Sequence, residues 1–284
     1  MISRRFDYHA PHNLDQAVAL LDQAKGDATI VGGGTWVVPE MTHGQRTPAH
    51  VIDLRNAGIA GVEADVGGIK IGATTTYSSL RSEPLVRERA GLLATMAVGV
   101  TGGAQVRNQA TIGGSACYAT PSSDAPGALV ALDARMRLVS AGGVREIDAA
   151  DFFLAAFEAD IKSGEILSEI VIPEPPANAR WGYYKLKLVE SSWPIATAGC
   201  VVGLDDAGAV TSARVAVGGV NTKPYVVDTT ELIGRPIDAA AGAAVADAAR
   251  SRATDPYSDV LASGEYRQQV SGVVAKRALL AAAA

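Results

Sequence analysis

The stretch VRNQATIGGSACYATPSSD, residues 106–124, decides how the rest of the sequence is interpreted. It places Gly113 and Gly114 between two small hydroxyl residues, Thr111 and Ser115. Two adjacent glycines allow positive φ angles, so that successive main-chain N–H groups point at one anion. The flanking hydroxyls add donors for the same oxygen atoms. The stretch therefore predicts a loop that binds a pyrophosphate, although a plain Gly-Gly turn has the same pattern.

A second glycine-rich loop occurs earlier in the chain. Residues 28–31 have the pattern of a buried strand, and they run directly into Gly32-Gly33-Gly34-Thr35. A strand followed by three glycines and a threonine suits a second diphosphate-binding loop.

A Rossmann fingerprint is the competing interpretation of this second loop. Gly32-x-Gly34 follows a strand, and Asp53 lies about 20 residues on, where an acid that binds ribose is expected. However, Val37 occupies the third glycine position. The crossover between residues 36 and 50 also contains three residues that interrupt helices: Pro39, Gly44 and Pro48. We therefore reject the Rossmann interpretation.

Composition limits the class of protein. The chain has 284 residues, of which 48% are apolar and 19% charged, so it is long enough for two domains with cores of their own. A formal net charge of −5 gives no reason to expect a nucleic acid or an anionic membrane as partner. No stretch approaches the roughly 20 apolar residues of a membrane span, and the N-terminus lacks a secretory pattern. The expected location is the cytoplasm.

Metal chemistry is not expected on this chain. Its two cysteines, Cys117 and Cys200, lie far apart and form no C-x-x-C pair, which predicts buried apolar side chains. The four histidines form no H-x-x-x-H pair, so no metal ligands are assigned.

Periodicity and turn signals divide the chain into an α+β pattern with a boundary at Pro173-Glu174-Pro175-Pro176. Before the boundary we expect strands near residues 6–11, 51–54, 62–64, 69–73 and 165–172, and a hairpin over 137–147. Helices are expected over 14–24, 87–98 and 148–157, and another begins at a cap on Ser123 or Asp124. After the boundary we expect strands near 181–189, 195–204, 209–217 and 223–226, and helices over 239–253 and 265–283.

Taken together, several motifs resemble one known family. They are ATIVGGGT (28–35), IKIGATTTYSSL (69–80), VRNQATIGGS (106–115), SSDAPGALVALDA (122–134) and GEIL (164–167). Their order and spacing are similar to the FAD-binding medium subunit of the molybdenum hydroxylases, which include carbon monoxide dehydrogenase and xanthine dehydrogenase. The likeness runs from near Phe6 to the last helix, where EYR (265–267) and RALL (277–280) also match.

The resemblance implies a fold and a cofactor. It implies a two-lobed FAD-binding domain of the vanillyl-alcohol oxidase class over residues 1–176, with lobes of about 1–54 and 55–176. A small α+β C-terminal domain would follow over residues 177–284. FAD would lie between the two lobes and the C-terminal domain.

Residues that would contact FAD are carried over by position. The first loop would contribute Ile30, Val31, Gly32, Gly33, Gly34, Thr35, Trp36 and Val37, and the second would contribute Thr111, Ile112, Gly113, Gly114 and Ser115. Further contacts would come from Thr101, Asp124, Leu167 and Lys185. The sequence departs from the family at Gly34, where a polar residue is usual, and at Ser115, where many members have Asn.

Several of these residues also have simpler interpretations. Asp124 is expected to cap a helix, and a flavin role would put it beside a sugar or ribityl hydroxyl, since the pyrophosphate would repel it. Lys185 fits an ordinary surface lysine on a strand. Leu167 fits a core residue that would equally exclude water from a flavin ring. Trp36 and Trp193 are further candidates to border the flavin.

The resemblance also implies a role. FAD would take electrons from a small iron–sulfur subunit and pass them to an external acceptor such as NAD or a quinone. A large subunit with a molybdenum–pterin centre would oxidise the organic substrate, and the assembly would be a dimer of heterotrimers. No catalytic side chain is assigned to this chain. Two alternatives remain: a self-sufficient FAD-dependent reductase of the cell-wall precursor type, and a scaffold that has lost its flavin.

Overall fold

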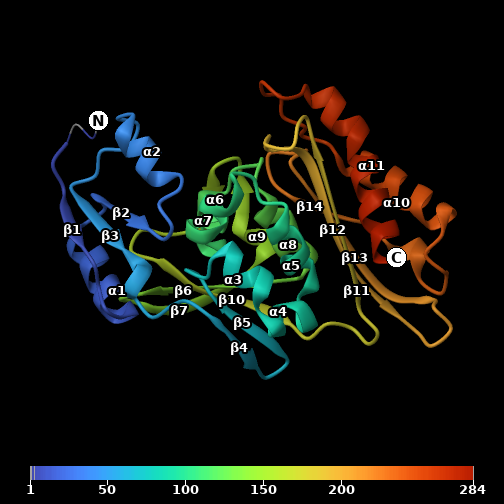
Figure 1. The fold of residues 1–284 in the computed structure, drawn as a ribbon, viewed down its shortest axis with the longest axis horizontal. Coiled ribbons are helices and arrows are strands. Elements are labelled where there is room, and N and C mark those ends of the chain that lie inside the picture. Colours follow the sequence, from blue (N-terminus) through green and yellow to red (C-terminus); the bar gives the residue numbers. More distant parts are fainter. Residues whose placement is uncertain (1, 3, 284) are drawn as a thin grey trace.

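The computed structural model describes residues 2 and 4–283, and it shows three parts in the order of the chain (Figure 1). The first part is a small lobe around a three-stranded parallel sheet, ordered β1 (Asp7–His9), β3 (His50–Asp53), β2 (Ala28–Val31). Helix α1 (Leu14–Gln23) begins where the Asn13 side chain accepts a hydrogen bond from the Gln16 N–H group. Short helix α2 (Val37–Thr42) follows β2, so the glycine loop lies at the carboxyl end of a parallel strand.

The second lobe is built on a five-stranded antiparallel sheet. The strand order is β4 (Val62–Asp65), β5 (Gly68–Gly72), β10 (Ile166–Pro173), β6 (Arg135–Ser140), β7 (Gly143–Asp148). The helices on this lobe are α3 (Tyr77–Ser82), α4 (Pro84–Arg89), α5 (Gly91–Val98), α6 (Gly103–Gln109), α7 (Ile112–Tyr118) and α8 (Asp124–Ala131). A 3₁₀ turn, η1 (Leu54–Asn56), leads into the lobe from β3. Its core joins Ile71 and Ile170 of the sheet to Leu93 and Leu129 of the helices, all of them buried.

Two of the helices expected in this lobe have other bounds in the structure. The helix expected over 87–98 is broken at Ala90 (φ −143°, ψ 46°), and the next residue, Gly91, lies against the Trp181 ring of the C-terminal domain. The helix expected over 148–157 is only α9 (Ala149–Phe152), and it passes into the two-stranded pair β8 (Phe153–Ala155) and β9 (Glu158–Ala159). Adjacent Phe152 and Phe153 are both buried, which the strand conformation at Phe153 permits.

The C-terminal domain is a four-stranded antiparallel sheet covered by two helices. The strands follow chain order: β11 (Arg180–Lys187), β12 (Pro194–Leu204), β13 (Val210–Gly218) and β14 (Tyr225–Val227). A 3₁₀ turn, η2 (Thr230–Leu232), precedes the helices α10 (Ala239–Arg252) and α11 (Gly264–Ala282), which lie on the outer face of the sheet (Figure 1). Helix α11 approaches β11 so closely that a Cβ atom on Gly182 would lie 1.9 Å from the carbonyl oxygen of Ala278.

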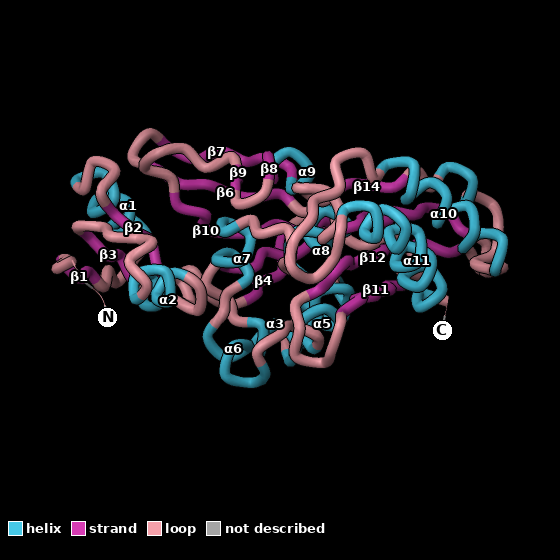
Figure 2. Tube along the Cα trace, turned by 90° about the horizontal axis from the view of Figure 1, so that it is seen from above, coloured by secondary structure: helices cyan, strands magenta, loops and turns pink. Residues whose placement is uncertain are grey.

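The inner face of this sheet packs on the second lobe. Gly199 of β12 faces Leu92 of α5 and Ala131 of α8, with a built Cβ 3.0 Å from the Leu92 side chain. The Arg214 guanidinium of β13 donates to the Val130 carbonyl oxygen and pairs with Asp133. Seen from above, the three parts form an elongated row with the second lobe in the middle (Figure 2). Within the described residues, no helix combines the length and apolarity needed to cross a bilayer.

Candidate functional site

A cavity of about 490 Å³ lies where the three parts of the chain meet. The first lobe contributes the loop of residues 32–37, and the second lobe contributes Thr111 and residues 113–115. The C-terminal domain contributes Trp193 and Pro194. The volume falls within the roughly 300–1,000 Å³ that is typical of pockets for cofactors and other small molecules.

The structure brings most of the predicted contact residues to this cavity. Its lining includes Ile30, Gly32, Gly33, Gly34, Thr35, Trp36, Val37, Thr101, Thr111, Gly113, Gly114, Ser115, Asp124 and Leu167. Three predicted residues do not line it. Val31 and Ile112 are buried apolar side chains in the cores of their lobes, and Lys185 lies behind Asp124.

The first glycine loop presents unpaired main-chain donors. Among the described residues, no acceptor faces any of the six successive N–H groups from Gly32 to Val37. Helical hydrogen bonding begins one residue later, where the Val38 N–H group donates to the Gly34 carbonyl oxygen. These six residues are partly buried and all of them line the cavity, so the run offers several free donors to an anionic ligand.

The reason for glycine in this loop differs from the sequence prediction. Only Gly34 has a positive φ, of 70°, while Gly32, Gly33, Gly113 and Gly114 have ordinary backbone angles. Gly33 is needed because the lobes touch there, and a Cβ would lie 1.9 Å from the carbonyl oxygen of Gln109. A Cβ on Gly32 would lie 2.8 Å from Thr111 Oγ1. Close approach between two lobes therefore selects these glycines.

The second glycine stretch is not a loop of free amides, so that part of the prediction is wrong. It is the first turn of α7, and its N–H groups already have acceptors. Gly113 donates to the Ala73 carbonyl oxygen at 2.9 Å, Gly114 to Thr111 Oγ1 at 3.1 Å, and Ser115 to the Thr111 carbonyl oxygen at 3.1 Å. This stretch contributes hydroxyl groups to the cavity. Thr111 Oγ1 accepts a hydrogen bond from Gly114, and its own O–H group remains free to donate.

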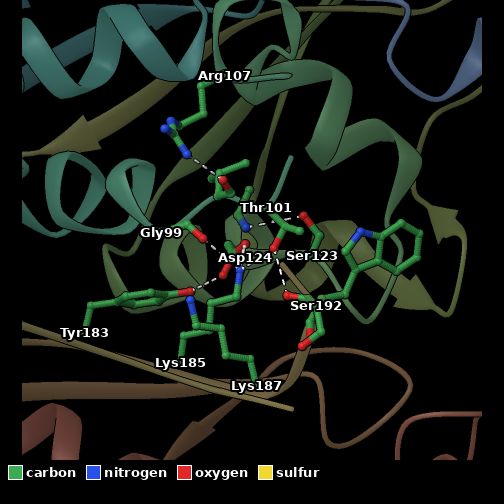
Figure 3. A network of polar contacts seen from close by, with 12 residues as sticks. Gly99, Thr101, Arg107, Ser123, Asp124, Tyr183, Lys185, Lys187 and Ser192 are labelled. Atoms are coloured by element: carbon green, nitrogen blue, oxygen red, sulfur yellow. Dashed lines mark hydrogen bonds and ion pairs between the residues drawn. The ribbon is translucent and has the colours of Figure 1, made fainter. Parts of the chain in front are cut away.

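Asp124 is the centre of a buried polar network (Figure 3). Its Oδ1 atom accepts from the Tyr183 hydroxyl at 2.5 Å, and its Oδ2 atom accepts from Lys185 Nζ at 2.9 Å. Burial raises the pKa of Asp124, and the positive charge of Lys185 opposes that rise. Ser123, not Asp124, caps α8. The expectation that Asp124 is the cap is therefore wrong.

Lys185 is a buried residue, contrary to the expectation of a surface lysine. Its side chain is 6% exposed, and all three donors of the ammonium group are used. Besides Asp124, Nζ donates to the Gly99 carbonyl oxygen at 2.9 Å and to Thr101 Oγ1 at 3.0 Å. Thr101 in turn donates to the Ser192 carbonyl oxygen at 3.0 Å (Figure 3). Lys185 thus fixes two loops at the edge of the cavity without lining it.

Aromatic side chains form one wall. The Trp36 ring lies edge-on to Tyr118 at 4.9 Å and tilted against Trp193 at 4.8 Å, between ring centroids. Trp36 Nε1 is buried, and no described residue accepts its hydrogen. Tyr118 was not predicted, because a lone tyrosine in a glycine-rich stretch carries no motif. Trp36 and Trp193, the candidates to border the flavin, both line the cavity.

A loop over residues 161–165 also lines the cavity. The GEIL motif begins at residue 164, and no signal in the sequence indicated that the residues before it take part. The Arg145 guanidinium holds this loop by bonds to both carboxylate oxygens of Glu165 and to the Asp160 carbonyl oxygen. Arg145 and Glu165 are twenty residues apart, so no local sequence pattern indicates this ion pair.

The cavity therefore suits a ligand that has both an anionic group and a flat apolar group. Unpaired amides and hydroxyls supply donors for an anion, and the aromatic wall supplies a flat surface. Cys117 also lines the cavity, and burial raises the pKa of its thiol to about 12, so it stays protonated. Among the described residues, no three His, Cys, Asp or Glu side chains are grouped to hold a metal ion.

Comparison with known proteins agrees with this geometry. Two family models match the chain: the FAD binding domain in molybdopterin dehydrogenase over residues 4–175, and the CO dehydrogenase flavoprotein C-terminal domain over residues 181–282. The chain is 34% identical to the carbon monoxide dehydrogenase medium chain of Hydrogenophaga pseudoflava, over 99% of this chain and 98% of that one. It is 30% identical to subunit alpha of the 6-hydroxypseudooxynicotine dehydrogenase complex of Paenarthrobacter nicotinovorans, over 96% and 93% of the two chains.

Solved structures show the same fold. Carbon monoxide dehydrogenase from Hydrogenophaga pseudoflava matches with a TM-score of 0.92 and 33% identity, covering 99% of this chain and 98% of that chain. Quinoline 2-oxidoreductase from Pseudomonas putida 86 matches with a TM-score of 0.91 and 27% identity, covering 100% and 98%. With both family models and nearly the whole length matched, the chain belongs to the FAD-binding medium subunits of the molybdenum hydroxylases, a family of oxidoreductases.

Proposed function

We propose that the cavity holds FAD and that this chain receives electrons from an iron–sulfur subunit and delivers them to an external acceptor. FAD supplies the redox chemistry when bound, and the chain's residues bind it, orient it and exclude water. The observation that supports this placement best is the run of unpaired N–H groups from Gly32 to Val37 on the cavity wall. It suits the diphosphate of a dinucleotide cofactor.

Hydroxyl groups beside the first glycine loop complete the proposed diphosphate site. The free O–H of Thr111 and the side chain of Ser115 face the same space as the first glycine loop. In this arrangement Gly34 needs no side chain, because main-chain groups supply the donors. We propose that Ile30 and Leu167 provide apolar walls on either side of the cofactor.

The Asp124 network has a different proposed part. Each carboxylate oxygen of Asp124 accepts one hydrogen bond and keeps a lone pair for a hydroxyl group of the sugar or ribityl chain. Lys185 acts through Asp124 and Thr101, because it neutralises the buried carboxylate and holds the loop of residue 101 in place. We propose that Thr101, and not Lys185, contacts the cofactor.

The organic substrate is proposed to react on another chain. Relatives include subunits of multi-subunit dehydrogenases, and we propose a small iron–sulfur subunit and a large molybdopterin subunit as partners in a dimer of heterotrimers. Within this chain we propose a domain boundary at residues 173–176. The core of the second lobe and the core between the C-terminal sheet and its helices form two clusters, and Ala216 of β13 is the fully buried residue beyond the boundary that joins the first of them.

An apolar surface beside the cavity suits the iron–sulfur partner. Leu188 and Val189 are 66% and 56% exposed, and Trp193 is 42% exposed where it lines the cavity. Exposed apolar groups of this size, next to the site that must receive electrons, are typical of a protein interface. Val189→Asp should therefore reduce copurification of the iron–sulfur subunit. Val66→Asp, at a position 102% exposed in the turn between β4 and β5, should leave it unchanged.

The decisive experiment is coexpression of the three chains followed by purification through a tag on this one. We expect two further polypeptides, flavin absorbance, and reoxidation of the reduced complex by NAD or a quinone only when FAD is present. A chain that purifies alone and oxidises NADPH with an enolpyruvyl sugar nucleotide would instead be a self-sufficient reductase. A complex without any flavin would show a scaffold.

A further inference from the structure

Arg46 provides a free guanidinium edge at the cavity. Its side chain is 41% exposed, and it lines the same cavity as the first glycine loop. The Nε atom donates to Glu40 Oε2 at 2.7 Å. Among the described residues, neither terminal nitrogen of Arg46 has a hydrogen-bond acceptor. Two donors of a planar, permanently charged fork are therefore available.

Glu40 and Tyr118 hold the Arg46 guanidinium in position. Glu40 lies on α2, directly after the glycine loop, and its other carboxylate oxygen accepts from the Tyr118 hydroxyl at 2.6 Å. Burial acts to raise the pKa of Glu40, but the bonds from Tyr118 and Arg46 hold it below the ordinary value, so the carboxylate stays charged. Tyr118 in turn packs against Trp36. Trp36 therefore supports Tyr118, Tyr118 bonds to Glu40, and Glu40 orients the Arg46 guanidinium.

The other charged groups of the lining are already paired or lie in solvent. Asp124 is neutralised by Lys185, and Glu165 is held by Arg145. Lys162 is an exposed side chain on the loop over residues 161–165. Within residues 2 and 4–283, Arg46 is thus the positively charged residue of the cavity lining that has both a fixed orientation and unused hydrogen-bond donors.

We propose that the two terminal nitrogens of Arg46 bind a phosphate group of the cofactor and supply the side-chain positive charge that the glycine loop lacks. The inference rests on the proposed placement of FAD in this cavity. Two donors in a fork match two phosphate oxygens, and such charge-assisted bonds are stronger than those of a neutral amide. Glu40 and Tyr118 are positioning residues in this arrangement, since they act through Arg46.

A purely structural role for Arg46 would be to neutralise Glu40, and a double variant separates the two roles. The measurements are FAD retention by the intact complex after desalting, and the dissociation constant of the deflavinated complex for FAD at low and high salt. The variants are Arg46→Gln, Arg46→Lys and the pair Glu40→Gln with Arg46→Gln. Arg135→Gln is the control, because Arg135 is a 51% exposed arginine that pairs with Glu146 and does not line the cavity.

We expect Arg46→Gln to weaken FAD binding about tenfold or more, as the loss of a hydrogen bond to a charged group does. It should also reduce the salt dependence of the dissociation constant, because a partly exposed ion pair is screened by salt. Arg46→Lys should keep the salt dependence and part of the affinity. The double variant should still bind FAD weakly, and Arg135→Gln should match the wild type.

Two results would overturn the inference while the proposed function stands. One is wild-type affinity and salt dependence in Arg46→Gln. The other is full recovery of FAD affinity in the double variant, which would show that Arg46 only balances Glu40. A wild-type complex that binds no FAD would instead refute the proposed function itself.

Discussion

Gly33→Ala tests the contact between the two lobes on which the cavity depends. The new Cβ would lie 1.9 Å from the Gln109 carbonyl oxygen, 2.6 Å from the Gln109 carbonyl carbon and 2.9 Å from the Ala110 Cα atom. All three are main-chain atoms at the end of α6, so no side-chain rotation relieves the clash. Moving from 1.9 Å to an ordinary contact of 3.4 Å requires a shift of 1.5 Å.

The size of the effect follows from this shift. Overpacking of a tight contact costs about 1–3 kcal/mol. The shift also displaces the N–H groups of Gly32 to Val37 by more than a hydrogen bond tolerates, and each bond to a charged group contributes about 1.5–3 kcal/mol. Loss of one or two such bonds lowers FAD affinity by about tenfold to a thousandfold or more. We expect a lower melting temperature and a complex that has lost most of its flavin.

The assay measures flavin per chain, the dissociation constant for FAD and the melting temperature of the complex. Gly142→Ala is the control, since its Cβ would have Ser140 Oγ as nearest atom at 3.6 Å and its backbone needs no left-handed angle. Full flavin content and wild-type affinity in Gly33→Ala would refute the argument that this glycine exists for the approach of the lobes.

Two further predictions concern charged groups. Lys185→Met should destabilise the chain by about 3–5 kcal/mol, because it leaves the buried Asp124 carboxylate without a positive partner. Thermal or denaturant unfolding should show that adding Asp124→Asn restores much of this loss. If the single and double variants were equally unstable, Lys185 would matter for packing and not for charge. Arg145 holds the pKa of Glu165 below its ordinary value, so the stabilisation from this pair is present above the unfolded pKa of about 4.3 and is lost as pH falls through the lower folded pKa. Glu165→Gln should therefore make the acid-side fall in stability shallower, and an unchanged slope in unfolding titrations would contradict this role.

Much of the fold followed from local patterns. Strands next to glycine loops, the proline cluster and the motif order predicted the elements on both sides of residues 173–176 and the family to which the chain belongs. These signals are local because turn residues and hydrophobic periodicity act within a few residues.

The missed features depend on contacts between distant segments. Helix α7 was hidden because Gly113 and Gly114 disfavour helices, and burial of Ile112 and Ala116 outweighs that preference. The need for glycine at position 33 comes from Gln109 on the other lobe, which no local pattern reveals.

For Lys185 a usable signal existed. Tyr183 and Lys185 are two residues apart on β11, so they share one face of the strand, and both reach Asp124. A tyrosine and a lysine on one face of a strand, with a motif aspartate upstream, would have indicated a buried pair.

The most direct test of the whole account is the flavin content of the purified heteromeric complex. The account predicts one FAD for each copy of this chain in the wild type and in Gly142→Ala, and little or none in Gly33→Ala. A wild-type complex with intact partner subunits and no bound flavin would contradict it.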